Sequence, residues 1–158
     1  MTPSTEQRLR TIRLCLLTVI LGLLLGGATA IPLEHELRLV ARYVDHPWII
    51  KVRDALIDIY AKYPFIGYGT DWLAFGHFVI AIAFIGPWRD PMKNKWVVEF
   101  GMIACVLLVP YALIMGQVRG IPLGWRFIDC LFGVFGLIPL WLCRREINAL
   151  ECNSSTAA

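Results

Sequence analysis

Several polar and ionisable side chains of this chain lie inside or just outside its long apolar stretches, where a charge is costly and needs a partner or a purpose. They come from two of those stretches and from one polar turn. The set consists of Asp71, His77, Gln117, Arg119, Arg126 and Asp129. An imidazole with two guanidinium groups could hold an anionic headgroup through charge-assisted hydrogen bonds. A His–Asp pair could instead act as a general base with its orienting carboxylate.

Two interpretations of these side chains stay open. In the first, Arg126 and Asp129 form an ion pair that holds a helix end, because a spacing of three puts them on one helical face, and His77 bonds to a carbonyl. In the second, all six line a polar pocket that opens in the outer leaflet. The motifs HExxH, DxD, Walker A and GxSxG are missing, so binding is favoured over catalysis by His77 and Asp129.

The composition predicts the class of protein. Of the 158 residues, 58% are hydrophobic and only 17% are charged, and the apolar runs are separated by short charged segments. This pattern is typical of an all-α integral membrane protein. The net charge of +3 is spread over short clusters, without the basic face of a nucleic-acid-binding protein. The five cysteines show no CxxC spacing, so we expect no metal site and no cofactor.

The first apolar segment has two possible fates. It runs from Leu14 to Ile31 after a basic lead, and its end, Ala28-Thr29-Ala30, resembles a signal-peptidase site. Residues 1–31 are therefore either a cleaved signal peptide or a retained signal-anchor, and the length of the segment favours the anchor. Gly22 and Gly26 form a GxxxG pair, which permits close helix packing.

Residues 32–67 predict two amphipathic helices on the extracytoplasmic side. Apolar residues recur at helical spacing on both, with Glu34–Arg38 and Asp58–Lys62 as i,i+4 ion pairs on the opposite faces. Pro47 after His46 marks the start of the second helix. The alternative to a pair of helices lying on the membrane surface is a soluble helical hairpin that caps the bundle.

Residues 68–146 predict a region of three transmembrane helices, which makes three to four spans in total. The spans are expected at 68–87, from Trp96 to about Met115, and from about Trp125 to Cys143. Glu99 is expected to pair with Lys95 one turn away. Residues 147–158 are expected to form a disordered cytoplasmic tail.

Basic residues close to the ends of the spans predict the orientation. Eight of them fall on one side of the predicted topology: Arg8, Arg10, Arg13, Arg89, Lys93, Lys95, Arg144 and Arg145. That side is expected to be the cytoplasm. Both termini are then cytoplasmic, unless the first segment is removed.

Part of the chain resembles the VanZ-like family of small membrane proteins. The resemblance lies in the run from Thr70 to Phe78, which contains Asp71 and His77, and in Arg126, Asp129, Gly133 and Gly136. The chain departs from the family in the longer spacing from Asp71 to His77, in a missing Glu-x-x-Gln element, of which only Gln117 is left, and in the absent asparagine after Asp129. The stretch from Trp72 to Pro139 is also similar to a group of uncharacterised small bacterial multi-pass membrane proteins. Either resemblance implies a role in the bacterial envelope.

Taken together, these features predict a multi-pass protein of the bacterial cytoplasmic membrane, with a binding role favoured over an enzymatic one. Its partners are expected to be membrane lipids, through a bound headgroup, or another membrane protein, and not nucleic acid. The alternatives are a membrane-embedded enzyme that acts on a lipid or lipid-linked substrate, and a small transporter that assembles from several copies.

Overall fold

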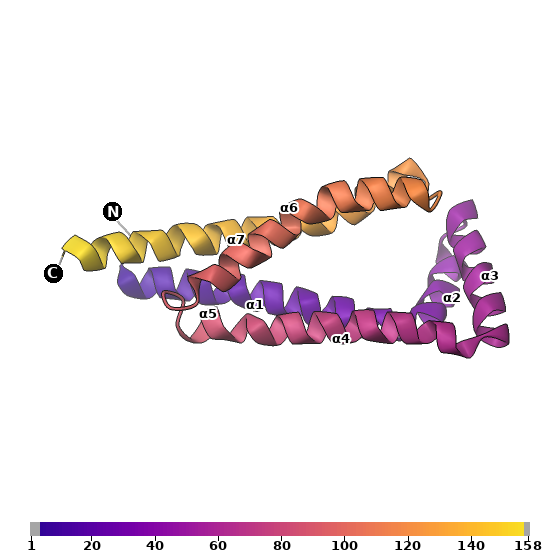
Figure 1. Ribbon diagram of the computed structural model, residues 1–158, viewed down its shortest axis with the longest axis horizontal. Helices are drawn as coiled ribbons and strands as arrows, with labels where there is room; N and C mark the ends of the chain where they lie inside the picture. The colour runs from indigo at the N-terminus through magenta and orange to yellow at the C-terminus, as the bar shows by residue number, and fades with distance from the viewer. Residues whose placement is uncertain (1–3, 157–158) are drawn as a thin grey trace. The chain divides into compact units, whose positions relative to one another are not determined.

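Four helices of this protein are long and apolar enough to cross a membrane. The computed structural model describes residues 4–156, and within that range it contains helices and turns but no strand (Figure 1). The apolar helices are α1 (Thr5–Ala30), α4 (Tyr68–Ala83) with its extension α5 (Ile85–Arg89), α6 (Lys95–Val118) and α7 (Leu123–Thr156). The prediction of an all-α protein with such helices is confirmed for the described residues.

The chain packs into two units. The hairpin unit comprises the residues up to Ile20 and those from Ile82 onward, so it holds the first part of α1 together with α5, α6 and α7. The amphipathic unit comprises Leu21–Ala81, with the last part of α1, α2 (Leu33–Tyr43), α3 (Pro47–Lys62), the 3-10 turn η1 (Pro64–Gly67) and most of α4.

In the hairpin unit, α6 and α7 pack side by side as an antiparallel pair (Figure 1). Glycines allow the close approach: a Cβ on Gly133 would lie 2.7 Å from the backbone oxygen of Cys105, and one on Gly101 would meet Phe84 and Leu140. The turn between the helices contains Gly120 with φ +67°, and the Ile121 N–H donates to the Gly116 carbonyl at 2.9 Å. This is a Schellman-type helix end, which requires the left-handed backbone that glycine adopts readily.

Helix α7 continues past the Arg144–Arg145 pair to Thr156, which differs from the predicted disordered tail over 147–158. Ile147 and Leu150 are buried, and they extend the buried stripe of Leu140 and Cys143 at helical spacing. The hydrophobic periodicity therefore keeps the segment helical after it has turned polar on its other face. Residues 157–158 of the predicted tail lie outside the described residues.

In the amphipathic unit, α2 and α3 pack against each other and Ile49 is buried. The His46 side chain accepts a hydrogen bond from the Trp48 N–H at 3.1 Å and so caps α3, with Pro47 in the first turn. The predicted i,i+4 ion pairs are both present, Glu34–Arg38 at 2.7 Å and Asp58–Lys62 at 3.8 Å. Local spacing was sufficient to predict these features.

The close contact between α1 and α4 within this unit uses adjacent glycines. A Cβ on Gly27 would lie 2.7 Å from the Phe78 ring and 3.0 Å from the Ala74 carbonyl oxygen, and one on Gly26 would lie 3.3 Å from the His77 ring. Gly22 has nothing within 4 Å of a Cβ placed on it. The predicted GxxxG pair is therefore not the packing pair here.

Candidate functional site

The turn between α6 and α7 holds one of the predicted site residues, Arg126, in a defined position. Its Nε–H donates to the Ile121 carbonyl oxygen at 2.7 Å, and its Nη1 donates to the Gln117 side-chain oxygen. A guanidinium carries five N–H donors, and these two bonds leave the others without an acceptor in residues 4–156. The two hydrogen bonds thus hold the guanidinium in place, and its other N–H groups remain available to a ligand.

Gly116 provides the space that this arrangement needs. A Cβ at that position would lie 2.7 Å from Cγ and 2.9 Å from Cδ of Arg126. Both atoms are near the root of the arginine side chain, so the side chain as a whole would have to move. Gly116 therefore belongs to the site, although its sequence context did not single it out.

Arg119 and Asp129 lie at the same end of the helical pair. Arg119 is the C-cap residue of α6 and is exposed, while Asp129 is half-buried one turn after Arg126. The Arg126–Asp129 ion pair, which is one of the two open interpretations of these residues, does not form. Arg126 bonds to Gln117 and Ile121 of the turn instead. Of the predicted set, Gln117 and Arg126 are in contact, and Arg119 and Asp129 flank them in sequence.

The two remaining predicted residues lie on different faces of α4. His77 Nδ1 is 2.8 Å from the Leu73 carbonyl oxygen, one turn back, and the ring packs on Gly26 of α1. Because a carbonyl oxygen only accepts, Nδ1 carries the proton in this bond. Asp71 is exposed beside Tyr68, Trp72 and Phe75. The six positions between Asp71 and His77 turn a helix by about 240°, which separates the two side chains.

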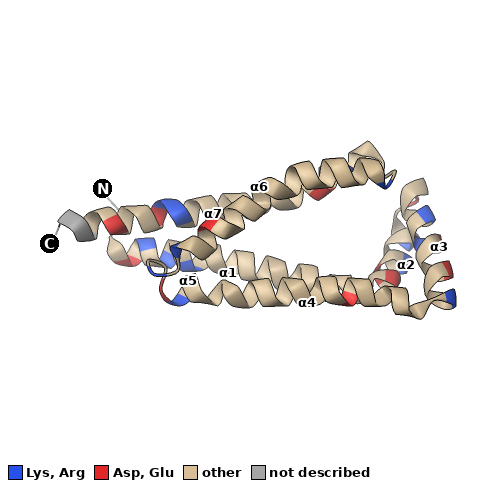
Figure 2. Cartoon of the chain, viewed as in Figure 1, with Lys and Arg blue, Asp and Glu red and all other residues tan. Residues whose placement is uncertain are grey.

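A cluster of charges in the hairpin unit was not predicted as a site. Glu146 is buried, with its side chain only 8% exposed, and it pairs with Arg8 of α1 at 2.6 Å and with its neighbour Arg145 at 2.9 Å. Figure 2 shows acidic and basic residues together where α1 begins and where α7 nears its end. Glu146 lies three residues after Cys143 on the buried stripe of α7, and that spacing would have indicated its burial.

The same cluster corrects the predicted Lys95–Glu99 pair. Glu99 pairs with Arg144 of α7 at 2.7 Å, and Lys95 pairs with Glu151 at 2.5 Å. Helix α7 passes close enough to offer both partners, and the favourable order of an i,i+4 pair has the acid first, which Lys95 and Glu99 reverse. Glu99 still has a structural role, because its pair joins α6 to α7.

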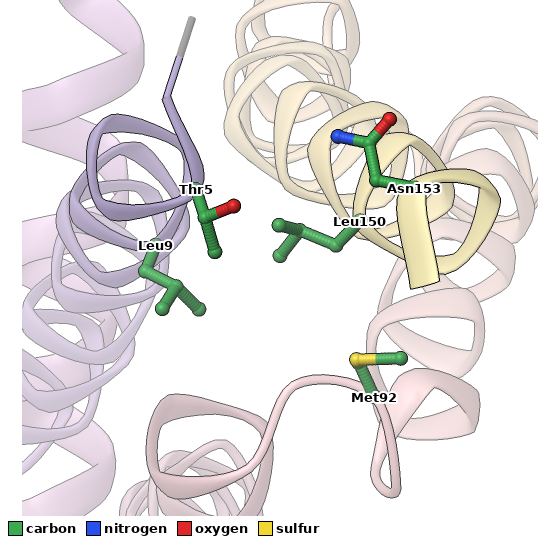
Figure 3. Close-up of a pocket in the computed structure, with 5 residues that line it drawn as sticks. All are labelled: Thr5, Leu9, Met92, Leu150 and Asn153. Carbon is green, nitrogen blue, oxygen red and sulfur yellow. The ribbon is translucent and has the colours of Figure 1, made fainter. Parts of the chain in front are cut away.

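A cavity of about 310 Å³ opens in the hairpin unit, near the start of α1 (Figure 3). Leu9, Met92 and Leu150 line it with apolar groups, and Thr5 and Asn153 supply the polar ones. Figure 3 shows these side chains around an open centre. The lining has no titratable group, so the cavity offers space for packing but no acid–base chemistry.

Known proteins give no guide to the role of this site, so its role is inferred from its own geometry. No protein-family model, curated protein or solved structure matches this chain. The resemblance to the VanZ-like family therefore stays a prediction.

Proposed function

We propose that this is a multi-pass protein of the bacterial cytoplasmic membrane that binds the phosphate of a phospholipid headgroup at the α6–α7 turn. The observation that carries the proposal is the Arg126 guanidinium, fixed by Gln117 and Ile121 with donors left over. Arginine recognises phosphate through its planar set of donors. The polar residues of the turn serve binding and not turnover.

The charges around Arg126 favour a particular kind of anion. Arg119 and Arg126 contribute two positive charges and Asp129 one negative charge, so the site has a formal charge of about +1. The first turn of α7 adds the partial positive charge of a helix N-terminus. A singly charged phosphodiester matches this site better than a doubly charged phosphomonoester does.

The orientation of the chain supports a site in the outer leaflet. The eight basic residues assigned to the cytoplasm by their position near span ends include Arg8, Arg13, Lys95 and Arg144. Their contacts in the hairpin unit bring them to one end: Arg8 meets Glu146, Arg144 meets Glu99, and Arg13 lies over the Trp88 ring. The α6–α7 turn is at the other end of α6, so this predicted orientation supports a position for the turn on the outer side.

Two substitutions test the proposal. Gly116→Ala keeps the positive charge of Arg126 but should displace its guanidinium, and Arg126→Ala should remove the site. We expect each to lower phospholipid retention in native mass spectrometry by roughly tenfold, the range of one or two charge-assisted hydrogen bonds. Gly124→Ala is the matched control, because nothing lies within 4 Å of a Cβ there. Equal retention by the Arg126→Ala, Gly116→Ala and control proteins would remove the proposal.

A further inference from the structure

An aromatic hollow with a carboxylate lies on one face of α4. It is lined by Tyr68, Asp71, Trp72 and Phe75 and has a volume of about 220 Å³. Their spacing of three and four residues puts all four side chains on one helical face. Tyr68, Trp72 and Phe75 are 61%, 57% and 55% exposed, so more than half of each aromatic residue is open.

The rings are arranged so that their faces remain available. The Tyr68 and Trp72 centroids are 5.8 Å apart at an interplanar angle of 84°, and those of Trp72 and Phe75 are 5.6 Å apart at 87°. In an edge-to-face pair the edge of one ring covers one face of the other, and the remaining faces stay open. Centroids this close also let one cation lie within about 6 Å of two rings at once, the distance at which the ring quadrupole attracts it.

Asp71 adds a negative charge to the hollow. In the part of the chain that the structure describes, its carboxylate has no hydrogen bond and no ion pair. Cation–π contacts occur at three other tryptophans, each with a basic side chain of the protein over its ring: Trp48 with Lys51, Trp88 with Arg13 and Trp141 with Arg145. Within residues 4–156 no such contact covers Trp72, which has an acid beside it instead. The hollow therefore has the charge that complements a cation from outside the chain.

The position of the hollow indicates where that cation comes from. Tyr68 to Phe75 lie in the first half of the apolar segment Pro64–Arg89, which is long enough to span a membrane. Aromatic residues at such a position lie at the level of the lipid headgroups. Zwitterionic phospholipids carry a positively charged group at that level and supply it at high local concentration.

We propose that this hollow binds the alkylammonium end of a zwitterionic phospholipid headgroup. The aromatic faces attract the alkylammonium group, and the Asp71 carboxylate compensates its charge, as in aromatic cages for choline-like ligands. The site uses none of the residues of the α6–α7 turn, so it does not rest on the function proposed above. The competing explanation is an aromatic belt that anchors the helix without preferring any headgroup.

The test measures headgroup preference. The full-length protein is placed in nanodiscs of phosphatidylglycerol mixed with either phosphatidylcholine or phosphatidylethanolamine, and native mass spectrometry counts the lipids that stay bound. We expect at least one of the two ammonium lipids to be enriched roughly fivefold over its share of the disc, the factor for a weak cation–π site. Asp71→Asn and Trp72→Leu should each remove the enrichment, and Asp71→Glu should keep it.

Control variants separate this site from general effects. Asp45→Asn removes a negative charge from an exposed loop position of the same unit and should leave the enrichment unchanged. Arg126→Ala should lower the total number of bound phospholipids without lowering the enrichment of the ammonium lipids over phosphatidylglycerol. An unenriched wild type, or enrichment that survives both Asp71→Asn and Trp72→Leu in proteins with unchanged helical circular dichroism, overturns the proposal in favour of an unselective belt.

Discussion

At the scale of single residues, Glu146 is the buried charged residue in the described part of the hairpin unit, and its carboxylate needs cationic partners. Removing an ion from water costs several kcal/mol, and a buried ion pair repays that cost only with good geometry on both sides. Glu146 has two cationic partners, whereas the Arg8 side chain, 14% exposed, has this one carboxylate as its salt-bridge partner in residues 4–156. The Nε of Arg8 is buried and has no hydrogen bond within the described residues. Glu146 would therefore keep a cationic partner if Arg8 were removed, whereas Arg8 would lose its salt-bridge partner if Glu146 were removed.

This inequality predicts unequal costs of truncation. Glu146→Ala leaves the Arg8 guanidinium buried and unpaired, so we expect a loss of about 3–5 kcal/mol in the free energy of unfolding. Arg8→Ala should cost less, because Arg145 still meets the carboxylate. Chemical denaturation in detergent, followed by circular dichroism, measures both. Asp58→Ala breaks an exposed pair and should change the free energy by about 0–1 kcal/mol. A Glu146→Ala protein as stable as the Asp58→Ala protein would contradict the conclusion that Glu146 compensates the buried charge of Arg8.

At the scale of elements, the α6–α7 pair depends on the absence of side chains at its contact. Gly133 faces the backbone oxygen of Cys105, which is part of a helix and cannot move aside as a flexible side chain can. Gly124 is in the same helix with open space around it, although both positions carry the same residue. The two glycines therefore separate the packing requirement from the intrinsic cost of glycine in a helix.

We expect alanine substitutions at these two glycines to have opposite signs. Gly133→Ala should lower the free energy of unfolding by about 1–3 kcal/mol, because the new methyl group overpacks the helix contact. Gly124→Ala should raise it by up to about 1 kcal/mol, since alanine has the higher helix propensity. Thermal denaturation of both variants in the same detergent measures the sign of each change. A Gly133→Ala protein as stable as Gly124→Ala would mean that the two helices do not approach so closely.

The elements that could be predicted from the sequence are those determined by local spacing. The cap at His46–Pro47, the pair of Glu34 and Arg38 and the apolar helices all follow from residues within one or two turns. The features that were missed depend on partners distant in the chain. Lys95 pairs with Glu151 rather than with Glu99, and Arg126 bonds to Gln117 across the turn rather than to Asp129. A single sequence does not contain the tertiary contacts that make this choice.

At the scale of the whole molecule, α1 contributes residues to both units: those up to Ile20 belong to the hairpin unit and those from Leu21 onward belong to the amphipathic unit. In the hairpin unit, Ile12 and Leu16 are fully buried and Arg8 pairs with Glu146. In the amphipathic unit, Gly27 packs on α4. Cleavage after Ala30 would remove all of these contacts and leave Glu146 without its interhelical partner.

We therefore expect residues 1–30 to be retained in the mature protein. Ile12 and Leu16 are fully buried, and the loss of α1 would remove the close packing that these side chains make with the rest of the hairpin unit. The protein is purified from bacterial membranes through a C-terminal tag. Intact mass spectrometry should then give the mass of the full chain. A variant with leucine at Ala28 and Ala30, which a signal peptidase would not cut, should have the mass of the full chain plus the two substitutions. A wild type lighter by the mass of residues 1–30, beside an uncut variant, would show that the helix is a signal peptide.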